Sequence, residues 1–219
     1  MKILYTPLMI VPSIDADQRA RIIEAAGPGS TLVETAMDAL IEDAMGPGDP
    51  ATEEPPCRYL GIVLPAGNLG NTAAFGKALR EAHDLGLIDR VPRLLAVQAA
   101  GAAPFAAGFA DDFATRRRVR AETAATAIRI GDPASWDRAV DAIRFSNGHV
   151  VAVSDAEIFA AKRVIDACGV GCEPASAASV AGVRTLVERG VVGRDERVVS
   201  VLTGQYADHV AACLRTDIR

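Results

Sequence analysis

From residue 59 onward, short and nearly continuous apolar runs alternate with longer stretches in which apolar residues recur every three or four positions. The first pattern is typical of buried strands and the second of amphipathic helices. Strands are expected at LGIVL (60–64), PRLLAVQAA (92–100), HVVAV (149–153) and RVVSVLTG (197–204). Helices are expected at 71–86, 132–148, 156–169 and 176–190. This alternation predicts an α/β fold with a mostly parallel sheet flanked by helices.

Several of the expected helices carry boundary signals. Asp132 followed by Pro133 has the form of an N-cap with a proline in the first turn, and Ser154 with Glu157 has the form of a capping box. Gly86 is a suitable residue to end the helix that begins at 71. Because the strands are parallel, their carboxyl ends lie at one edge of the sheet, where ligands bind in such folds.

The first 58 residues follow a different pattern. Residues 1–45 contain two short β-type runs, at 2–11 and 31–34, and amphipathic helical patterns at 15–27 and 35–45, which predicts a short β-α-β-like segment. Residues 46–58 are so rich in proline, glycine and acidic side chains that they are expected to form a linker. The remaining residues, 59–219, are expected to form the main domain.

Composition and charge exclude several classes of protein. Half of the 219 residues are hydrophobic and the formal net charge is −5, which argues against a nucleic-acid-binding surface. The basic run 116–120 is a local exception, expected to be a solvated loop or an anion contact. No apolar stretch has the length of a membrane span or a signal peptide, and the 4 cysteines lack zinc-site spacing. We therefore expect a cytoplasmic protein with reduced thiols, no membrane partner and no metal.

A glycine-rich loop follows the strand at 60–64. The sequence Gly67-Asn68-Leu69-Gly70-Asn71 opens a predicted helix, whose first N–H groups and dipole favour an anion such as phosphate. Both glycines are expected to adopt backbone angles closed to other residues. The spacing fits neither a Walker loop nor a dinucleotide-binding fingerprint. A tight strand-to-helix turn without a ligand remains the alternative.

Several blocks in the same order resemble the C-terminal half of threonine synthase, a fold-type-II enzyme that depends on pyridoxal phosphate. They are VLPAGNLGNTAAFGKALREAHDLGLIDRVPRLLAVQAAGAAPF, ETAATAIRIGDPASW, VSDAEIFAAKRV, CEPASAASVAGVRTL and VVSVLTG, within residues 59–204. The resemblance implies part of the large domain of that fold. Residues 1–45 weakly resemble the N-terminus of a D-2-hydroxyacid dehydrogenase.

The resemblance also implies a cofactor site. In the family, the loop corresponding to Gly67, Asn68, Leu69, Gly70 and Asn71 wraps the cofactor phosphate, and the threonine corresponding to Thr203 bonds the pyridine nitrogen. The E-P-A-S-A block, Glu173–Ala177, lies near the cofactor in relatives or else caps a helix. The implied activity is that of a lyase in threonine biosynthesis, which converts O-phosphohomoserine and water into threonine and phosphate.

In the family, the lysine that binds the cofactor lies in a Phe-Lys-Asp block upstream of the phosphate loop. Because this sequence contains no such block, its catalytic residues are unknown. The lysines here are Lys2, Lys77 and Lys162, and none stands in such a block. We expect an incomplete, threonine-synthase-like protein that binds pyridoxal phosphate or a small phosphorylated amino acid and could form homo-oligomers through an uncovered sheet edge. The alternative is a non-catalytic phosphate-binding or interaction module.

Overall fold

The computed structural model describes residues 2–5, 31–34, 61–168, 170–193 and 196–204. The helical patterns expected at 15–27 and 35–45, and the linker expected at 46–58, lie outside these residues, as does His209. The two β-type runs near the N-terminus are described as β1 (Lys2–Tyr5) and β2 (Thr31–Glu34), which pair in parallel as a separate two-stranded sheet. The proposed division of the chain into three parts stays a prediction.

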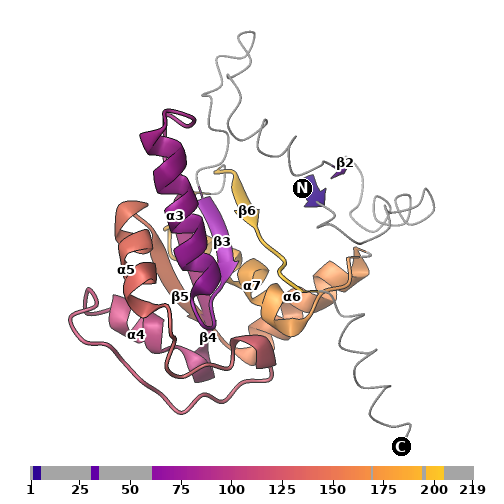
Figure 1. The fold of residues 1–219 in the computed structure, drawn as a ribbon. Helices are drawn as coiled ribbons and strands as arrows, with labels where there is room; N and C mark the ends of the chain where they lie inside the picture. The colour runs from indigo at the N-terminus through magenta and orange to yellow at the C-terminus, as the bar shows by residue number, and fades with distance from the viewer. Residues whose placement is uncertain (1, 6–30, 35–60, 169, 194–195, 205–219) are drawn as a thin grey trace, which may run out of the picture.

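The main sheet has four parallel strands, in the order β5-β4-β3-β6 (Figure 1). Their bounds are Gly61–Pro65 for β3, Arg93–Ala99 for β4, His149–Val153 for β5 and Val198–Ser200 for β6. Strands β4, β5 and β6 lie within the apolar runs, β6 being shorter than its run, whereas β3 extends one residue beyond its run, to Pro65. The expected α/β fold with a parallel sheet is confirmed.

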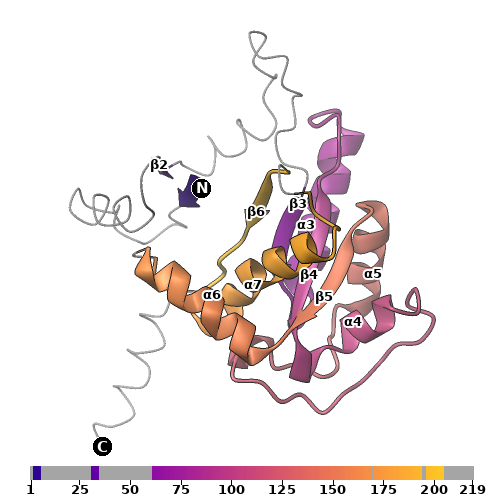
Figure 2. The same cartoon turned by 180° about the vertical axis from the view of Figure 1, so that it is seen from behind.

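Helices cover the sheet on both faces, as the opposite views in Figures 1 and 2 show. On one face lie α3 (Gly70–Asp84), α4 (Pro104–Phe109) and α5 (Trp136–Phe145). On the other face lie α6 (Asp155–Ala167) and α7 (Pro174–Glu188). Two short 3₁₀ turns, η1 (Ala100–Ala102) and η2 (Thr126–Ile128), belong to the connections. Helix α4 and both turns have no counterpart in the sequence prediction.

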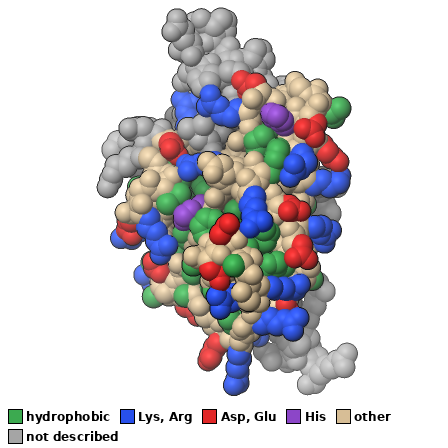
Figure 3. Space-filling view, turned by 90° about the vertical axis from the view of Figure 1, so that its left-hand side faces the viewer, with side chains coloured by type: hydrophobic (Ala, Val, Ile, Leu, Met, Phe, Trp, Pro, Cys, Tyr) green, Lys and Arg blue, Asp and Glu red, His purple; other side chains and the backbone are tan. Residues whose placement is uncertain are grey.

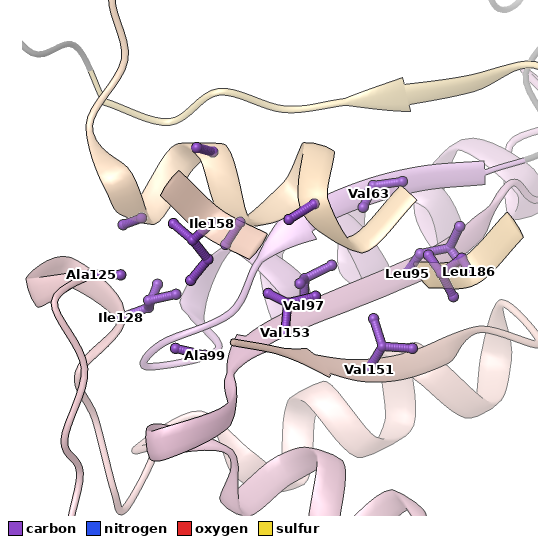
Figure 4. Packing of buried hydrophobic residues seen from close by; sticks show 14 of the residues in the cluster. Val63, Leu95, Val97, Ala99, Ala125, Ile128, Val151, Val153, Ile158 and Leu186 are labelled. Atoms are coloured by element: carbon purple, nitrogen blue, oxygen red, sulfur yellow. The ribbon is translucent and has the colours of Figure 1, made fainter. Parts of the chain in front are cut away.

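The two faces of the sheet contribute to two separate cores because side chains alternate along each strand. Val63, Leu95, Val97, Val151 and Val153 point toward α6 and α7, where they pack with Ile158 of α6 (Figure 4). Leu64, Leu94, Ala96 and Val150 pack instead with residues of α3, α4 and α5. Strands β3, β4 and β5 are thus covered on both faces within the described part of the chain.

The second core includes a cluster of aromatic rings. Trp136 is buried and stands edge-on to Phe105, with ring centroids 5.2 Å apart. Phe113 stacks at a tilt on Phe105 at 4.8 Å. These contacts hold α4 against the start of α5, which supports the connection between β4 and β5.

Two of the expected helix boundaries are confirmed and one is wrong. Ser154 and Glu157 form the expected capping box at α6, and Gly86 adopts the left-handed conformation (φ 69°) just beyond α3. Helix α5, however, begins at Trp136 instead of at Asp132-Pro133. The carboxylate of Asp132 does not cap the helix, because it pairs with Arg116 and Arg118.

Strand β6 forms one edge of the main sheet within the described residues. It pairs with β3 on one side, and its residues are half-buried. A homo-oligomer formed through this edge stays a prediction.

Among the described residues, no helix is both long enough and apolar enough to cross a bilayer.

Candidate cofactor site

The glycine loop and Thr203 leave the sheet side by side. Val63 of β3 is in register with Ser200 of β6, and the Val201 N–H donates to the Val63 carbonyl at 2.9 Å. Neighbouring strands lie about 4.8 Å apart, so residues 66–71 and 201–204 emerge at the same carboxyl edge.

This edge is also the point at which the chain reverses its direction across the sheet. From β3 the chain passes by α3 to β4 and β5, whereas α6 and α7 lead it back along the opposite face to β6, on the other side of β3. Ligands of open parallel sheets bind at such switch points, beyond the carboxyl ends of the strands. The sequence-predicted residues therefore occupy the position where a ligand is expected.

The glycine loop packs against two segments that are distant in sequence, η2 and the start of α5. The backbone N–H groups of Ala134 and Ser135 donate to Asn68, at Oδ1 (2.8 Å) and at the carbonyl oxygen (3.2 Å) respectively. A Cβ atom on Gly67 would lie 2.9 Å from Ile128 Cα, so only glycine allows this close approach. Asn68 and Gly67 thus serve to position the loop against η2 and the start of α5.

The expectation about the glycine backbone angles is wrong. Neither Gly67 nor Gly70 has a positive φ; Leu69 has one, at 64°. Leu69 is buried among residues of the second core, which stabilises this strained conformation. Gly70 is instead the first residue of α3, and an added Cβ would meet no atom within 4 Å. Open space beside its backbone allows a ligand to approach the main chain there.

The N-terminus of α3 has the features of an anion site. The N–H groups of Gly70, Asn71 and Thr72 precede the first intrahelical donor of the helix, since Ala73 N–H is the first to donate back, to the Leu69 carbonyl. No side chain caps the helix and its first turn contains no acidic residue. Asn71 is exposed at this end. Here the helix dipole favours a negative charge.

Thr72 adds a second, independent feature at the same position. Its side chain is 1% exposed, and its hydroxyl Oγ1 has no hydrogen-bond partner in the described structure. Buried hydroxyl groups are normally paired, because an unpaired one costs about 1–3 kcal/mol. An anion at the α3 N-terminus would supply the missing acceptor.

Thr203 lies on the other side of the site, beyond β6. Its side chain is exposed, and its hydroxyl lies 3.3 Å from that of Ser176 in α7. The backbone of the next residue, Gly204, also bonds to this end of α7: its carbonyl accepts from Glu173 N–H at 3.1 Å, and its N–H donates to the Ser176 side-chain Oγ at 2.8 Å. Helix α7 therefore fixes the position of Thr203.

Comparison with known proteins assigns the chain to a family. A family model described as pyridoxal-phosphate dependent enzyme matches residues 15–204. The chain belongs to this family.

Its relatives include threonine synthases. That of Mycobacterium bovis is 49% identical over 143 residues, and that of Methanosarcina acetivorans is 47% identical over 145 residues. Each match covers 65% of this chain, and the chain spans 38% and 36% of the length of these two relatives. The resemblance to threonine synthase is thus confirmed.

The fold agrees with this assignment. The threonine synthase of Escherichia coli superimposes with a TM-score of 0.54 and 18% identity, over 98% of this chain and 56% of that one. The family is described as dependent on pyridoxal phosphate. An uncapped helix N-terminus with a buried, unpaired hydroxyl fits the phosphate of this cofactor, and an exposed, anchored threonine hydroxyl fits a ring nitrogen.

Two residues of the candidate site were missed from the sequence. Gln98 is fully buried at the end of β4, where its Nε2 donates to the Ala66 carbonyl at 3.1 Å. Its Oε1 accepts from the N–H groups of Phe105 (2.8 Å) and Ala106 (3.1 Å). Gln98 therefore joins the start of the glycine loop to α4. In the sequence, it stood out only as a polar residue within an apolar run. Thr72 gave no signal beyond its place next to Asn71.

The described lysines do not point to a covalent cofactor site. Lys77 is exposed on α3, about two turns beyond Asn71, and its Nζ pairs with Glu81 at 2.7 Å. Lys162 lies on α6 and pairs with Asp166 at 2.7 Å. Lys2 belongs to β1, and its side chain is not among those described.

The basic run 116–120, His149 and Cys172 show no feature of a pyridoxal phosphate site. Arg116 and Arg118 of the basic run pair with Asp132, and Arg117 pairs with Asp111, as expected of a solvated loop. Figure 3 shows charges of both signs interspersed over the face it presents. His149 lies at the amino end of β5, opposite the site edge. Burial raises the pKa of the Cys172 thiol to about 11, which keeps it protonated and unreactive.

Proposed function

We propose that this chain binds pyridoxal 5′-phosphate between the α3 N-terminus and Thr203, as the cofactor-binding part of a threonine-synthase-like enzyme. The single observation that carries the proposal is the buried, unpaired Thr72 hydroxyl at an uncapped helix N-terminus. Family membership identifies the ligand that fits it.

The phosphate would be held by the glycine loop. The N–H groups of Gly70, Asn71 and Thr72, together with the Thr72 hydroxyl, are donors for a dianionic group. Gly70 leaves the space for the phosphate to reach the backbone, since no atom lies within 4 Å of its Cβ position. Gly67, Asn68 and Leu69 keep the loop in place against η2, α5 and the core.

The pyridine ring would extend from this loop toward β6, where the Thr203 hydroxyl can bond its nitrogen. A neutral hydroxyl at that position orients the ring without requiring a full positive charge on the nitrogen. When bound, pyridoxal phosphate supplies an electron sink for negative charge that develops on the substrate. The proposed family reaction is the conversion of O-phosphohomoserine and water into threonine and phosphate.

We further propose that the residues of this chain hold the cofactor without a covalent bond. Lys77 faces solvent and pairs with Glu81, at 2.7 Å, so its amine is directed away from the loop. Treatment of the loaded chain with borohydride, followed by peptide mass spectrometry, should reveal no pyridoxyl group on Lys77. A stoichiometric adduct at Lys77 would contradict this part of the proposal.

Calorimetric titration with pyridoxal phosphate and with inorganic phosphate tests the site. Gly70→Val should abolish the binding of both ligands, because the added side chain fills the space that the phosphate needs. The fold should tolerate this change, since Gly70 has no positive φ and an open Cβ position. Ala74→Val, which enlarges an exposed residue one turn further along α3, is the matched control and should bind both ligands normally.

Thr203→Val distinguishes the cofactor from a simple phosphate ligand. It should weaken pyridoxal phosphate roughly tenfold, the equivalent of about 1.4 kcal/mol, and leave inorganic phosphate unaffected. If Gly70→Val abolishes binding but Thr203→Val changes nothing, the alternative of a non-catalytic phosphate module is favoured. If the unmodified chain shows no saturable binding, the proposal fails.

A further inference from the structure

The start of α7 carries a set of hydroxyl groups that bind the segment containing Thr203. Ser176 and Ser179 are one helical turn apart, and both are fully buried. Ser179 Oγ donates to the Val201 carbonyl at 3.0 Å or to the Ser176 carbonyl at 2.8 Å, and it accepts from Ser200 Oγ at 2.9 Å. Ser176 Oγ accepts from Gly204 N–H at 2.8 Å. The two serines thus hold the chain on both sides of Thr203.

Gly204 lies directly against Glu173. A Cβ atom at this position would lie 2.5 Å from Glu173 Oε1, and the Gly204 carbonyl accepts from the Glu173 N–H at 3.1 Å. The E-P-A-S-A block therefore acts as a docking surface for the Thr203-Gly204 turn. Glu173 stands at the N-cap position of α7, but its side chain makes no capping hydrogen bond to the helix. The alternative role of this block, as a side-chain helix cap, is therefore not observed.

Donor and acceptor counts favour one arrangement of the hydrogens on these hydroxyl groups, although the Ser176–Thr203 contact by itself allows either hydroxyl to donate. A serine hydroxyl has one hydrogen and two lone pairs. Ser176 uses a lone pair for the Gly204 N–H, and its hydrogen can reach either the Gly204 carbonyl, at 3.2 Å, or Thr203 Oγ1, at 3.3 Å. The Gly204 carbonyl already accepts from Glu173 N–H, whereas Thr203 Oγ1 has no other partner among the described residues.

We propose that Ser176 is a positioning residue that donates to Thr203 Oγ1 and thereby directs the Thr203 hydrogen toward the ligand. This inference rests on the proposed function, in which the ligand at Thr203 is the pyridine nitrogen of pyridoxal phosphate. A hydroxyl that donates to this nitrogen favours its unprotonated form, and one that accepts favours its protonated form. Ser176 therefore sets the proton affinity of the ring nitrogen without touching the ring.

The test uses the full chain loaded with pyridoxal phosphate that is ¹⁵N-labelled in the ring, and follows the nitrogen chemical shift against pH. In Ser176→Ala, Thr203 is free to accept a hydrogen, so the nitrogen should become protonated at a higher pH than in the unmodified chain. Affinity for pyridoxal phosphate should fall by up to roughly tenfold. Ser179→Ala is the matched control, because it removes an equally buried hydroxyl of the same clamp that does not contact Thr203.

The double variant Ser176→Ala/Thr203→Val decides between a role through Thr203 and a general structural role. If Ser176 acts through Thr203, adding Ser176→Ala to Thr203→Val should not change the nitrogen titration any further, whereas affinity can still fall because Gly204 N–H loses its acceptor. A further shift of the nitrogen titration in the double variant, or a titration in Ser176→Ala equal to that in Ser179→Ala, would overturn the inference while the proposed function stands. Failure of the unmodified chain to bind pyridoxal phosphate would overturn both.

Discussion

Replacing Thr72 with valine should have opposite effects on the ligand-free and the loaded protein. Thr72 lies in the first turn of α3, is 1% exposed, and has a hydroxyl without a partner in the described structure. Valine has nearly the same shape and a similar helix propensity, so the substitution chiefly removes the hydroxyl. This separates the role of the hydroxyl from that of packing.

The expected magnitudes follow from the state of that hydroxyl. An unpaired buried hydroxyl costs about 1–3 kcal/mol, so its removal should raise the free energy of unfolding of the ligand-free chain by about 1 kcal/mol. If the hydroxyl donates to a bound phosphate, its removal should weaken pyridoxal phosphate roughly tenfold, which is about 1.4 kcal/mol.

Urea unfolding with and without pyridoxal phosphate measures both effects on the same samples. At a ligand concentration 100 times its dissociation constant, binding stabilises the folded chain by about 2.7 kcal/mol, and a tenfold weaker variant would gain about 1.4 kcal/mol. Thr185→Val is the matched control. Thr185 is also a buried helical threonine, but its hydroxyl lies 3.4 Å from the Ala181 carbonyl that accepts from it, so no gain in stability is expected.

Two results would refute this reasoning. A ligand-free Thr72→Val chain that is less stable than the parent would mean that the hydroxyl makes a stabilising contact within the protein. An unchanged affinity for pyridoxal phosphate would mean that the phosphate does not lie at the first turn of α3.

Two further predictions concern the scaffold around the site. Gly182→Ala should lower the free energy of unfolding by about 1–2 kcal/mol, because the new Cβ would lie 2.3 Å from Val97 Cγ2 in the central sheet. Urea unfolding should show no comparable loss for Gly171→Ala, whose Cβ position is open, and equal stability of both variants would contradict the packing argument. Burial, followed by Arg189 and Arg93, lowers the pKa of His149 below its ordinary value of 6.5. The unfolded chain therefore binds this proton more readily, and stability should decline as the pH falls below about 6.5. His149→Gln should flatten that part of the stability profile, and an unchanged slope would exclude His149 as its source.

The strands and helices of the main domain could be predicted from local pattern, because strand and helix periods differ and both faces of this sheet are covered. The apolar runs at β3, β4 and β5 are continuous for that reason. The capping box at Ser154 needs only residues three apart, and it too was predicted correctly. The glycine loop and Thr203 were recognised by resemblance to a family, which the comparisons confirm, although their roles as ligand contacts stay a prediction.

Features that depend on distant partners could not be predicted. Asp132 has the local form of an N-cap, yet α5 begins later because Arg116 and Arg118 bind its carboxylate, while Ala134 and Ser135 donate to Asn68.

The positive φ at Leu69 depends in the same way on the core in which that side chain is buried. Propensity alone would place such a φ at one of the neighbouring glycines. The glycine at 67 is needed for a different reason, the approach of Ile128, more than 60 positions away along the chain.

The candidate site also combines features that the sequence predicts with features that depend on tertiary contacts. Residue type and the order of strand, loop and helix predicted the glycine loop as a phosphate contact, and resemblance to a family implied Thr203 as the contact of a ring nitrogen. Only the tertiary structure decided that β6 lies beside β3, that Ser176 reaches Thr203, and that the Thr72 hydroxyl is buried without a partner. Burial and strand order arise from contacts between distant segments, and no local pattern records them.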